Sequence, residues 1–403
     1  MDGEKKATLA VVALIVFIDS LGVGLILPVM PRLIGEITHS GLGQAAEFGG
    51  LLLFSYAAMQ FLFAPVIGGL SDRFGRRPVL LVTLFLLGID YLVMAAAPTL
   101  GWLFAGRLLS GLMGATWAAA NSCVADMIED DNRGGAFGML GGAGAAGFLL
   151  GPVVGGLAGE YGTRVPFLCA GALALIGSLL GLFLLKETLP PDRRRQFDPR
   201  RANPLGSILQ MARTPFVLKC LVVVFFMQLS AQAQFSIWAY WGELRFGWTP
   251  AISGLTVALY GFMLGLFQAM LTGKAIARYG AVQTARWSLL LGLPSYALLA
   301  FAGSTATVLA AIVVGAATGM TFPALQALMT ARTQRDAQGE LQGAIASTVS
   351  LTSIIGPVLM TQIFARFSDR TGLYLPGAPY VLSFALLSVA IVILWRTLRS
   401  SAR

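Results

Sequence analysis

Residues 68–78 read Gly-Gly-Leu-Ser-Asp-Arg-Phe-Gly-Arg-Arg-Pro, and this polar stretch separates two long apolar runs. Its glycines permit a tight turn, and Pro78 suits the first turn of a following helix. Asp72 and the neighbouring arginines can form charge-assisted pairs that hold adjacent helices in one of two arrangements. A plain basic loop is the simpler interpretation, but an aspartate among glycines and arginines favours a specific turn between two membrane helices.

The composition of the whole chain also indicates a membrane protein. Of its 403 residues, 56% are hydrophobic and 12% are charged, and the mean hydropathy is +0.76. Soluble domains carry about 25% charged residues, so these charges are too few to cover a surface in water. The composition excludes collagen-like, disordered and disulfide-rich proteins. It also argues strongly against a soluble enzyme.

Apolar windows of about 18 residues or more predict membrane-spanning helices, because a helix needs about 20 residues to cross the hydrocarbon layer. About twelve such windows occur, at residues 8–29, 48–69, 78–97, 101–124, 135–158, 165–185, 216–239, 251–272, 285–303, 305–327, 341–364 and 378–396. The first window is too long, and too polar at Asp19, for a signal peptide, so we expect it to be retained. The predicted fold class is all-α integral membrane.

The basic residues predict the orientation of these helices. With the N-terminus inside the cell, most of the 28 Lys and Arg residues lie on the cytoplasmic side. The exceptions are Arg32, Arg164, Arg245, Arg366 and Arg370 outside, and Arg107 within a span. This asymmetry predicts a multi-pass protein of the cell inner membrane with both termini cytoplasmic. The net charge of +9 therefore reflects topology, and we expect no nucleic-acid partner.

A long polar insertion and an internal repeat divide the chain. The insertion predicts an N-terminal bundle at residues 1–185, a cytoplasmic linker at 186–213 that touches anionic lipid, and a C-terminal bundle at 214–403. Four features recur 205 residues further along: Gly68 as Gly273, Arg73-Phe74-Gly75 as Arg278-Tyr279-Gly280, Gly138 as Gly343, and Gly151-Pro152 as Gly356-Pro357. Parallel repeats of this kind are typical of transporters whose substrate site lies between two related halves.

Several motifs resemble those of the major facilitator superfamily. The stretch at 68–78 resembles its signature loop, through Gly69, Asp72, Arg73, Gly75, Arg76 and Arg77. The sequence around Arg107, with Gly111 and Ala115, resembles its arginine motif. The residues Gly147, Gly151, Pro152, Gly155 and Gly156 resemble its antiporter motif. Small residues of this kind let helices pack closely, and Pro152 permits a bend. The resemblance implies twelve helices in two pseudo-symmetric six-helix bundles that work by alternating access.

Within that superfamily, the chain is most similar to the tetracycline efflux branch. The similar segments include Phe17–Gly22, Met59–Phe61, Ile89–Tyr91, Phe225-Phe226 and Pro323–Gln326. This branch has a histidine in span 8 and an aspartate in span 9, which fall near Gly265 and Gly292 of this chain. The repeat of the signature loop has Ala277 opposite Asp72. These departures restrict the expected proton chemistry to the N-terminal half and put metal–tetracycline recognition in doubt.

Three ionisable residues lie within predicted spans. Asp19 falls near the membrane midplane, and Asp90 and Arg107 fall in spans 3 and 4. A central charge costs about 2.5–3.5 kcal/mol on insertion scales, so each is a functional hypothesis. We expect Asp19 to carry a proton or another cation, with a structurally paired carboxylate as the alternative. For Asp90 and Arg107, a gating or structural pair and direct proton transfer both stay open.

Two further groups of residues have expected roles. The spacing of Asp126 and Arg133 predicts opposite charges at the inner ends of spans 4 and 5, where with the Asp72 loop they would form a cytoplasmic gate. Polar and aromatic residues that suit a cavity for an amphiphilic planar molecule are Gln60, Asn121, Gln228, Gln232, Ser236, Trp238 and Gln326. The alternatives are interhelical hydrogen bonds for the polar groups and an interfacial belt for the tryptophan. For Gln268, packing is the favoured interpretation.

The sequence therefore predicts a transporter. It has no P-loop, a single histidine and no paired cysteines, so we expect neither an enzyme nor a cofactor or metal site. The predicted function is proton-coupled export of a hydrophobic or amphiphilic drug-like compound, with tetracycline-like antibiotics among the candidates. The alternatives are an importer or metabolite exchanger on the same fold, and a non-transporting sensor or scaffold. The expected partners are a small-molecule substrate, protons and membrane lipid, and the expected state is a monomer.

Overall fold

A computed structural model describes residues 3–114, 116–128, 130–195, 214–334, 337–369 and 372–400. All regular structure within these ranges is helical, which confirms the predicted fold class. The longer helices of the first half are α1 (Gly3–Ile26), α2 (Met30–Thr38), α3 (Leu42–Phe74), α4 (Arg76–Ala95), α5 (Leu100–Met113), α6 (Thr116–Met127), α7 (Asp130–Gly159) and α8 (Val165–Leu184). Those of the second half are α10 (Pro215–Phe246), α11 (Pro250–Leu266), α12 (Thr272–Ala300), α13 (Thr305–Gly315), α14 (Thr321–Thr330), α15 (Gln338–Ser368) and α16 (Ala378–Ser400).

Short irregular helices interrupt three of the predicted spans. The 3-10 helix η1 (Leu27–Val29) joins α1 to α2, and the 3-10 helix η5 (Ala316–Met320) joins α13 to α14. The π-helix η4 (Phe267–Leu271) joins α11 to α12. A further 3-10 turn, η2 (Pro191–Arg193), follows α8.

The helix lengths agree with the twelve predicted spans. Ten helical runs of the described residues are long and apolar enough to cross a membrane. One of them, Pro250–Ala300, has 51 residues, which is about twice the length needed for one crossing. Helices α5 and α6 are each too short to be counted alone, and together they cover the fourth predicted window. Counting the long run as two spans and α5 with α6 as one gives twelve for the described residues.

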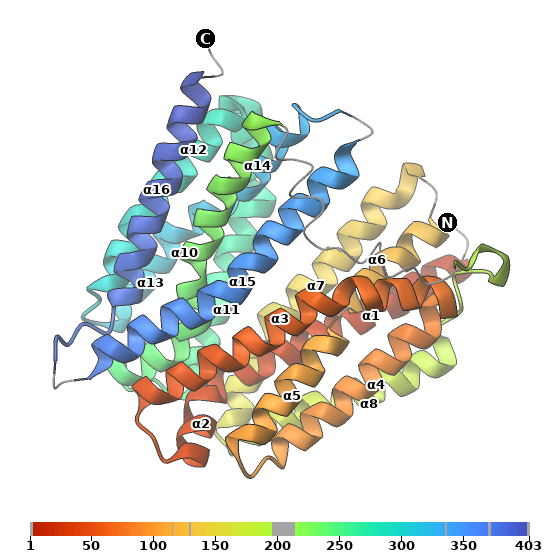
Figure 1. Cartoon of the computed structure of the whole chain (residues 1–403), viewed down its shortest axis with the longest axis horizontal. Coiled ribbons are helices and arrows are strands. Elements are labelled where there is room, and N and C mark those ends of the chain that lie inside the picture. Colours follow the sequence, from red (N-terminus) through yellow and green to blue (C-terminus); the bar gives the residue numbers. More distant parts are fainter. Residues whose placement is uncertain are drawn as a thin grey trace. The chain divides into compact units, whose positions relative to one another are not determined.

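The described residues form two compact units (Figure 1). The N-terminal unit comprises the described parts of Met1–Ser40, Ser55–Asn203 and Thr249–Leu255. The C-terminal unit comprises those of Gly41–Phe54, Pro204–Trp248 and Thr256–Arg403. The start of α3 thus belongs to the C-terminal unit, and the first residues of α11 belong to the N-terminal unit.

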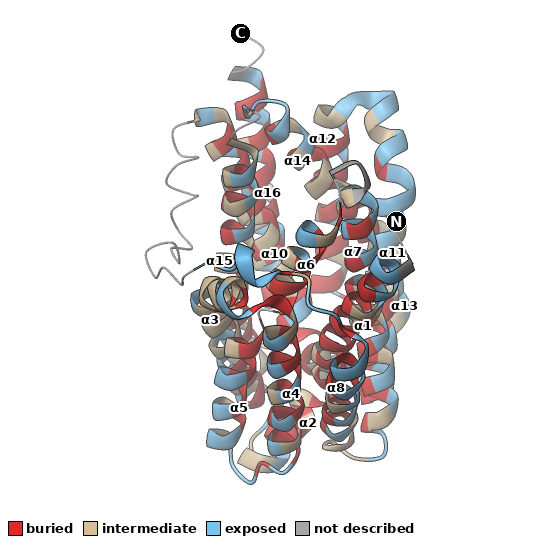
Figure 2. Cartoon of the chain, turned by 90° about the vertical axis from the view of Figure 1, so that its right-hand side faces the viewer, coloured by how far each residue is buried: buried red, intermediate tan, exposed pale blue. Residues whose placement is uncertain are grey.

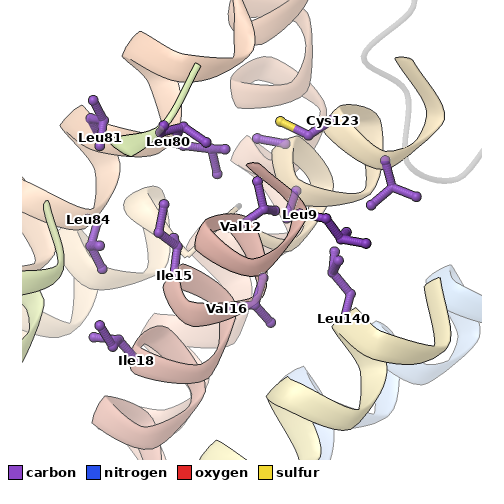
Figure 3. Packing of buried hydrophobic residues seen from close by; sticks show 14 of the residues in the cluster. Leu9, Val12, Ile15, Val16, Ile18, Leu80, Leu81, Leu84, Cys123 and Leu140 are labelled. Atoms are coloured by element: carbon purple, nitrogen blue, oxygen red, sulfur yellow. The ribbon is translucent and has the colours of Figure 1, made fainter. Parts of the chain in front are cut away.

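The core of the N-terminal unit surrounds α1, which packs against α6, α7 and α8. Figure 3 shows Val12, Ile15 and Val16 of α1 among Leu80 and Leu84 of α4 and residues of the neighbouring helices. These aliphatic side chains are nearly inaccessible. In the C-terminal unit, α10 packs against α15 and α16, and α12 packs against α13, α14 and α16.

The outer faces of the helices are apolar. Figure 2 shows helices that are buried along one face and exposed along the other. The exposed side chains include Leu62, Phe183 and Trp287, each more than half accessible. Such a surface would be poorly solvated in water but is suited to lipid hydrocarbon.

The internal repeat is also present in the backbone. Gly75, between α3 and α4, has φ 106° and ψ 160°, and its counterpart Gly280 within α12 has φ 78° and ψ 158°. Both conformations lie in the region that glycine alone adopts readily. The arginine two residues earlier lies over the following ring in each copy, with Arg73 5.2 Å from the Phe74 centroid and Arg278 5.5 Å from that of Tyr279. The repeat therefore preserves a turn and the side-chain stacking beside it.

Candidate functional site

A buried aspartate lies in the second half of α1. Asp19 is 6% exposed, and its one hydrogen bond to the described residues comes from the Thr116 hydroxyl of α6, at 3.4 Å. No described Lys or Arg lies within ion-pair distance of this carboxylate. The side chain is thus held within the helix bundle with only one weak partner, and it is available to bind a proton.

Asp90 and Arg107 lie on the adjacent helices α4 and α5 but have different partners. Asp90 accepts a hydrogen bond of 2.7 Å from the Ser110 hydroxyl. Arg107 lies with Nη2 3.3 Å from the sulfur of Met94, and its guanidinium carbon is 5.8 Å from the ring centroid of Tyr56. Within the described residues, the structure contains no ion pair between Asp90 and Arg107. Both groups are buried, at 1% and 5% exposure.

Arg76, at the start of α4, is the centre of a charged cluster. Its guanidinium lies 2.6 Å from the Asp72 carboxylate and donates to Asp126 of α6 at 2.8 Å and to the Ser71 hydroxyl at 3.0 Å. The arginine side chain is 8% exposed, whereas those of Asp72 and Asp126 are 44% and 24% exposed. The two carboxylates are therefore partly exposed, whereas the arginine that they bind is buried. Their ion pairs with Arg76 connect the turn between α3 and α4 to α6.

Glu187, just after α8, completes what we call the Arg76 cluster (Ser71, Asp72, Arg76, Asp126 and Glu187). Its carboxylate accepts the backbone N–H of Arg76 at 2.9 Å and so caps the N-terminus of α4, where an anion is favoured. The same oxygen accepts the N–H groups of Thr188 and Leu189 at 3.0 Å each. This role of Glu187 was not predicted from the sequence, because 111 positions separate it from Arg76.

Arg133 and Arg77, which were also predicted to belong to the gate, donate to backbone carbonyls. Arg73 lies over the ring of Phe74. Arg133 donates to the carbonyls of Ala125 and Ile128, at 3.0 and 2.9 Å, near the end of α6. Arg77 donates to the carbonyl of Leu182 at 2.6 Å. The partner of Asp126 in the structure is therefore Arg76, and Arg133 supports the backbone beside it. Gly68 and Gly69 lie within α3. A Cβ added at Gly68 would meet no atom within 4 Å.

The glycines of the antiporter motif lie where α7 packs against α1. A Cβ added at Gly151 would be 2.7 Å from the Cα of Gly24, and one added at Gly155 would be 2.6 Å from the Cα of Leu25. Gly147 approaches the backbone of α1 in the same way, near Leu21. Such distances are too short for any side chain, so these glycines set the spacing of the two helices.

The far end of α7 packs against the start of α11. A Cβ at Gly156 would lie 3.1 Å from the Cα of Ala251, and one at Gly254 would lie 2.8 Å from the carbonyl carbon of Pro152. Glu160, directly after α7, accepts the N–H of Ala251 at 3.1 Å. A hydrogen bond from Thr249, helped by that N–H, holds the pKa of Glu160 below its usual value. This end of α7 thus has both close backbone packing and a carboxylate cap for α11.

The C-terminal unit contains a cavity of about 250 Å³, which we call the C-terminal cavity. It is lined by Met227, Gln228, Ser230, Ala231, Gln232, Phe235, Tyr260, Leu264, Gln268, Tyr296, Thr318, Gly319, Phe322 and Leu387. The predicted residues Gln228 and Gln232 are among these side chains, four residues apart on α10. Gln268, for which we expected packing, also lines the cavity.

The remaining predicted binding residues lie elsewhere. In the N-terminal unit, Gln60 donates to the carbonyl of Gly114 at 2.8 Å, and Asn121 is an exposed residue of α6. In the C-terminal unit, Gln326 donates to Gln342 at 2.9 Å. Ser236 is buried, with no hydrogen-bond partner for its hydroxyl in the described part of the chain. None of these four lines the C-terminal cavity.

Trp238 belongs to an aromatic cluster that borders the cavity. Its indole N–H donates to Thr256 at 2.9 Å, and its ring centroid is 5.9 Å from those of Trp241 and Trp248 and 6.4 Å from that of Tyr260. Tyr260 is a lining residue, so the cluster supports one wall of the cavity from behind.

Comparison with known proteins agrees with these features. A family model described as Major Facilitator Superfamily matches residues 12–244 and 241–403. The chain belongs to the Major Facilitator Superfamily. As a member of this superfamily it is a multi-pass membrane protein that acts on a small-molecule substrate.

Similar superfamily members extend over nearly the whole chain. Tetracycline resistance protein, class C, of Escherichia coli is 40% identical over 395 residues, covering 98% of each chain. Multidrug resistance protein 2 of Bacillus subtilis (strain 168) is 27% identical over 362 residues, covering 88% of each. These relatives confirm the resemblance to the tetracycline efflux branch. A solved bacterial homolog of the human lysosomal transporter Spinster, in an inward-facing, occupied conformation, has a TM-score of 0.83 at 17% identity and covers 99% of this chain and 98% of that one.

Proposed function

We propose that this protein is a secondary active transporter of the bacterial inner membrane that exports a hydrophobic or amphiphilic drug-like compound in exchange for protons. The observation that carries the proposal is Asp19, a carboxylate that is 6% exposed and has no ion pair among the described residues. Such a group inside a membrane protein is expected to move protons or cations. The resistance proteins among its relatives support export, and they do not favour an importer, an exchanger, a sensor or a scaffold.

In this proposal the two units are the rocking halves of an alternating-access cycle, corresponding to six-helix bundles at 1–185 and 214–403 joined by the linker at 186–213. The repeated glycine turn at Gly75 and Gly280 supports two related halves. The protein works as a monomer, with both termini in the cytoplasm and the linker against anionic lipid headgroups. The strongly asymmetric distribution of Lys and Arg supports this orientation.

Each buried charge has a distinct role in the proposed cycle. Asp19 binds the proton that drives the exchange. Asp90, held by Ser110, and Arg107, over the ring of Tyr56, respond to that protonation as neighbouring groups on α4 and α5. The Arg76 cluster is a cytoplasmic gate, because its charge pairs can hold three segments of the N-terminal unit in one arrangement and release them in another.

Tetracycline-like antibiotics are among the candidate substrates, because a tetracycline resistance protein is 40% identical to the chain. This chain differs at two positions from the pattern that the resemblance implies. The histidine of span 8 and the aspartate of span 9 fall near Gly265 and Gly292, which are glycines here. We therefore propose that such compounds are recognised differently. The substrate range is therefore proposed to include uncharged compounds.

The test is transport by purified protein in proteoliposomes with an imposed pH gradient. Candidate compounds are first chosen by a toxicity panel of tetracyclines, phenicols and quinolones in an efflux-deficient host. Wild type should accumulate the compound against its gradient and release protons as it does so. Asp19→Asn should abolish uphill transport, while Glu47→Gln, the same chemical change at an exposed acid of α3, should retain it. Full uphill transport by Asp19→Asn would refute the coupling role.

A further inference from the structure

The described residues that line the C-terminal cavity include no Asp, Glu, Lys, Arg or His. Its polar groups are amides and hydroxyls, and the remaining side chains are aromatic or aliphatic. An ion held against such a surface would give up part of its hydration without gaining a counter-charge, which is costly. The part of a ligand that enters this cavity is therefore best matched if it is uncharged.

Two amides of the cavity have unused hydrogen-bonding capacity. Gln228 lies on α10 and Gln268 on the π-helix η4, and neither side chain makes a hydrogen bond to the residues that the structure describes. Gln232, in contrast, donates to Ser353 at 3.4 Å. A carboxamide offers both donors and an acceptor. The π-helix matters because an added residue per turn changes which side chains face the cavity, and such turns often occur at functional sites.

The aromatic lining and the volume restrict the shape of the ligand. Phe235, Tyr260, Tyr296 and Phe322 contribute rings to the walls, and rings of this kind pack well against a planar partner. A cavity of about 150 Å³ holds one benzene, so the observed volume of about 250 Å³ has room for about two fused rings or one substituted ring.

The same lining does not suit a metal chelate. Mg²⁺ and similar ions prefer carboxylate oxygens and retain several waters, but none of the cavity-lining residues in the described part of the chain is a carboxylate. The described residues contain no group of three or more His, Cys, Asp or Glu that could hold a metal ion. At Gly292, an added Cβ would already meet Thr318 at 2.9 Å, and Thr318 is itself a lining residue. The side chains of Thr318 and Leu387 therefore occupy the space that a larger side chain at position 292 would need.

We propose that the C-terminal cavity binds the neutral, planar aromatic part of the exported compound through the amides of Gln228 and Gln268, and that it does so without a metal ion. This inference rests on the proposed function, since it assigns the substrate class of that transporter.

The test is equilibrium binding of radiolabelled chloramphenicol, a neutral compound with a nitrophenyl ring and an amide, to the full-length protein in lipid nanodiscs. Binding should be the same with magnesium and with EDTA. Gln228→Leu and Gln268→Leu should each weaken it about fivefold, as expected for the loss of a single hydrogen bond. Gln283→Leu, an exposed glutamine of α12 outside the lining, is the matched control and should bind normally.

Gln228→Glu provides a second measurement that does not depend on loss of binding alone. It places a carboxylate in the cavity, so it should weaken chloramphenicol binding and introduce magnesium-dependent binding of tetracycline. Magnesium-dependent binding of either compound by wild type would overturn the inference. So would unchanged chloramphenicol affinity in both leucine variants.

The failure of this inference can be distinguished from failure of the proposed function. If chloramphenicol does not bind but another compound is exported uphill in an Asp19-dependent manner, the substrate class is wrong and the transporter function stands. If chloramphenicol binds as predicted but no compound is moved by a pH gradient, the binding site stands and proton-coupled export is wrong.

Discussion

Replacement of Gly155 by alanine should destabilise the N-terminal unit, although alanine is the better helix former. A Cβ added there would lie 2.5 Å from the carbonyl carbon and 2.6 Å from the Cα of Leu25. Carbon atoms in contact are ordinarily about 3.5–4.0 Å apart, so α1 and α7 would have to separate by about 1 Å. The obstructing atoms are backbone and cannot rotate away. We expect a loss of about 3 kcal/mol, the upper end of the usual range for overpacking.

Gly142 on the same helix provides the matched control. An added Cβ at Gly142 meets no atom within 4 Å, so alanine there should gain about 0.5–1 kcal/mol from helix propensity alone. The two substitutions are chemically identical and lie on one helix, yet the structure predicts opposite signs.

The assay is thermal unfolding of the purified protein, followed by tryptophan fluorescence at one fixed scan rate because unfolding is expected to be irreversible. Gly155→Ala should lower the midpoint by about 5–10 °C, and Gly142→Ala should raise it slightly. If both variants shift the midpoint in the same direction, or if Gly155→Ala melts at or above wild type, the close backbone contact between α1 and α7 is refuted.

Three further predictions concern the carboxylates. Glu187→Gln should lower the free energy of unfolding by about 1 kcal/mol, because α4 loses a charged cap. The control is Glu4→Gln, whose exposed pair with Lys186 should contribute less than about 0.5 kcal/mol. The unfolding midpoint of Glu187→Gln should therefore be the lower of the two, and equal midpoints would contradict the capping role. Because the pKa of Glu160 is lowered in the folded protein, its stabilising effect is present above the unfolded pKa and is lost as the pH falls through the folded pKa. The midpoint difference between wild type and Glu160→Gln should thus be largest near neutral pH and shrink as the pH falls through the lowered pKa of Glu160, and a difference that grows in acid would refute this assignment. Finally, any dependence of chloramphenicol affinity on pH near neutrality should disappear in Asp19→Asn, and its persistence there would exclude Asp19 as its source.

The fold could be predicted from the sequence because its determining signals are local. Apolar windows report the spans directly, and the glycine turn at residues 68–78 recurs in the second half with the same backbone conformation at Gly75 and Gly280. The buried positions of Asp19 and Asp90 also follow from their place within a window. For such residues, depth along a single helix is sufficient to predict burial.

The ion-pair partners of the charged residues could not be predicted in the same way. The spacing along the chain favoured Arg133 for Asp126, but the turn at Gly75 brings Arg76 to Asp126 instead, at 2.8 Å. Glu187 reaches the same cluster only because α8 returns beside α4.

The cavity lining shows a related limit. The spacing of four residues predicts that Gln228, Gln232 and Ser236 share one face of α10, but only the two glutamines line the cavity. Gln268 was expected to pack, and it lines the cavity from a π-helix, whose changed number of residues per turn alters the direction of each side chain.

The two units differ in their chemistry, and this difference constrains how coupling can work. The buried aspartates Asp19 and Asp90 belong to the N-terminal unit, whereas none of the described residues that line the C-terminal cavity changes charge near neutral pH. A neutral ligand in that cavity therefore cannot exchange with a proton on a shared lining carboxylate of the same unit. If protons and ligand nevertheless affect one another, thermodynamic reciprocity requires a change of state that both binding events bias. The closely packed glycines of α7 and the Arg76 cluster are suited to such a change, because backbone contacts and ion pairs favour discrete arrangements over continuous deformation.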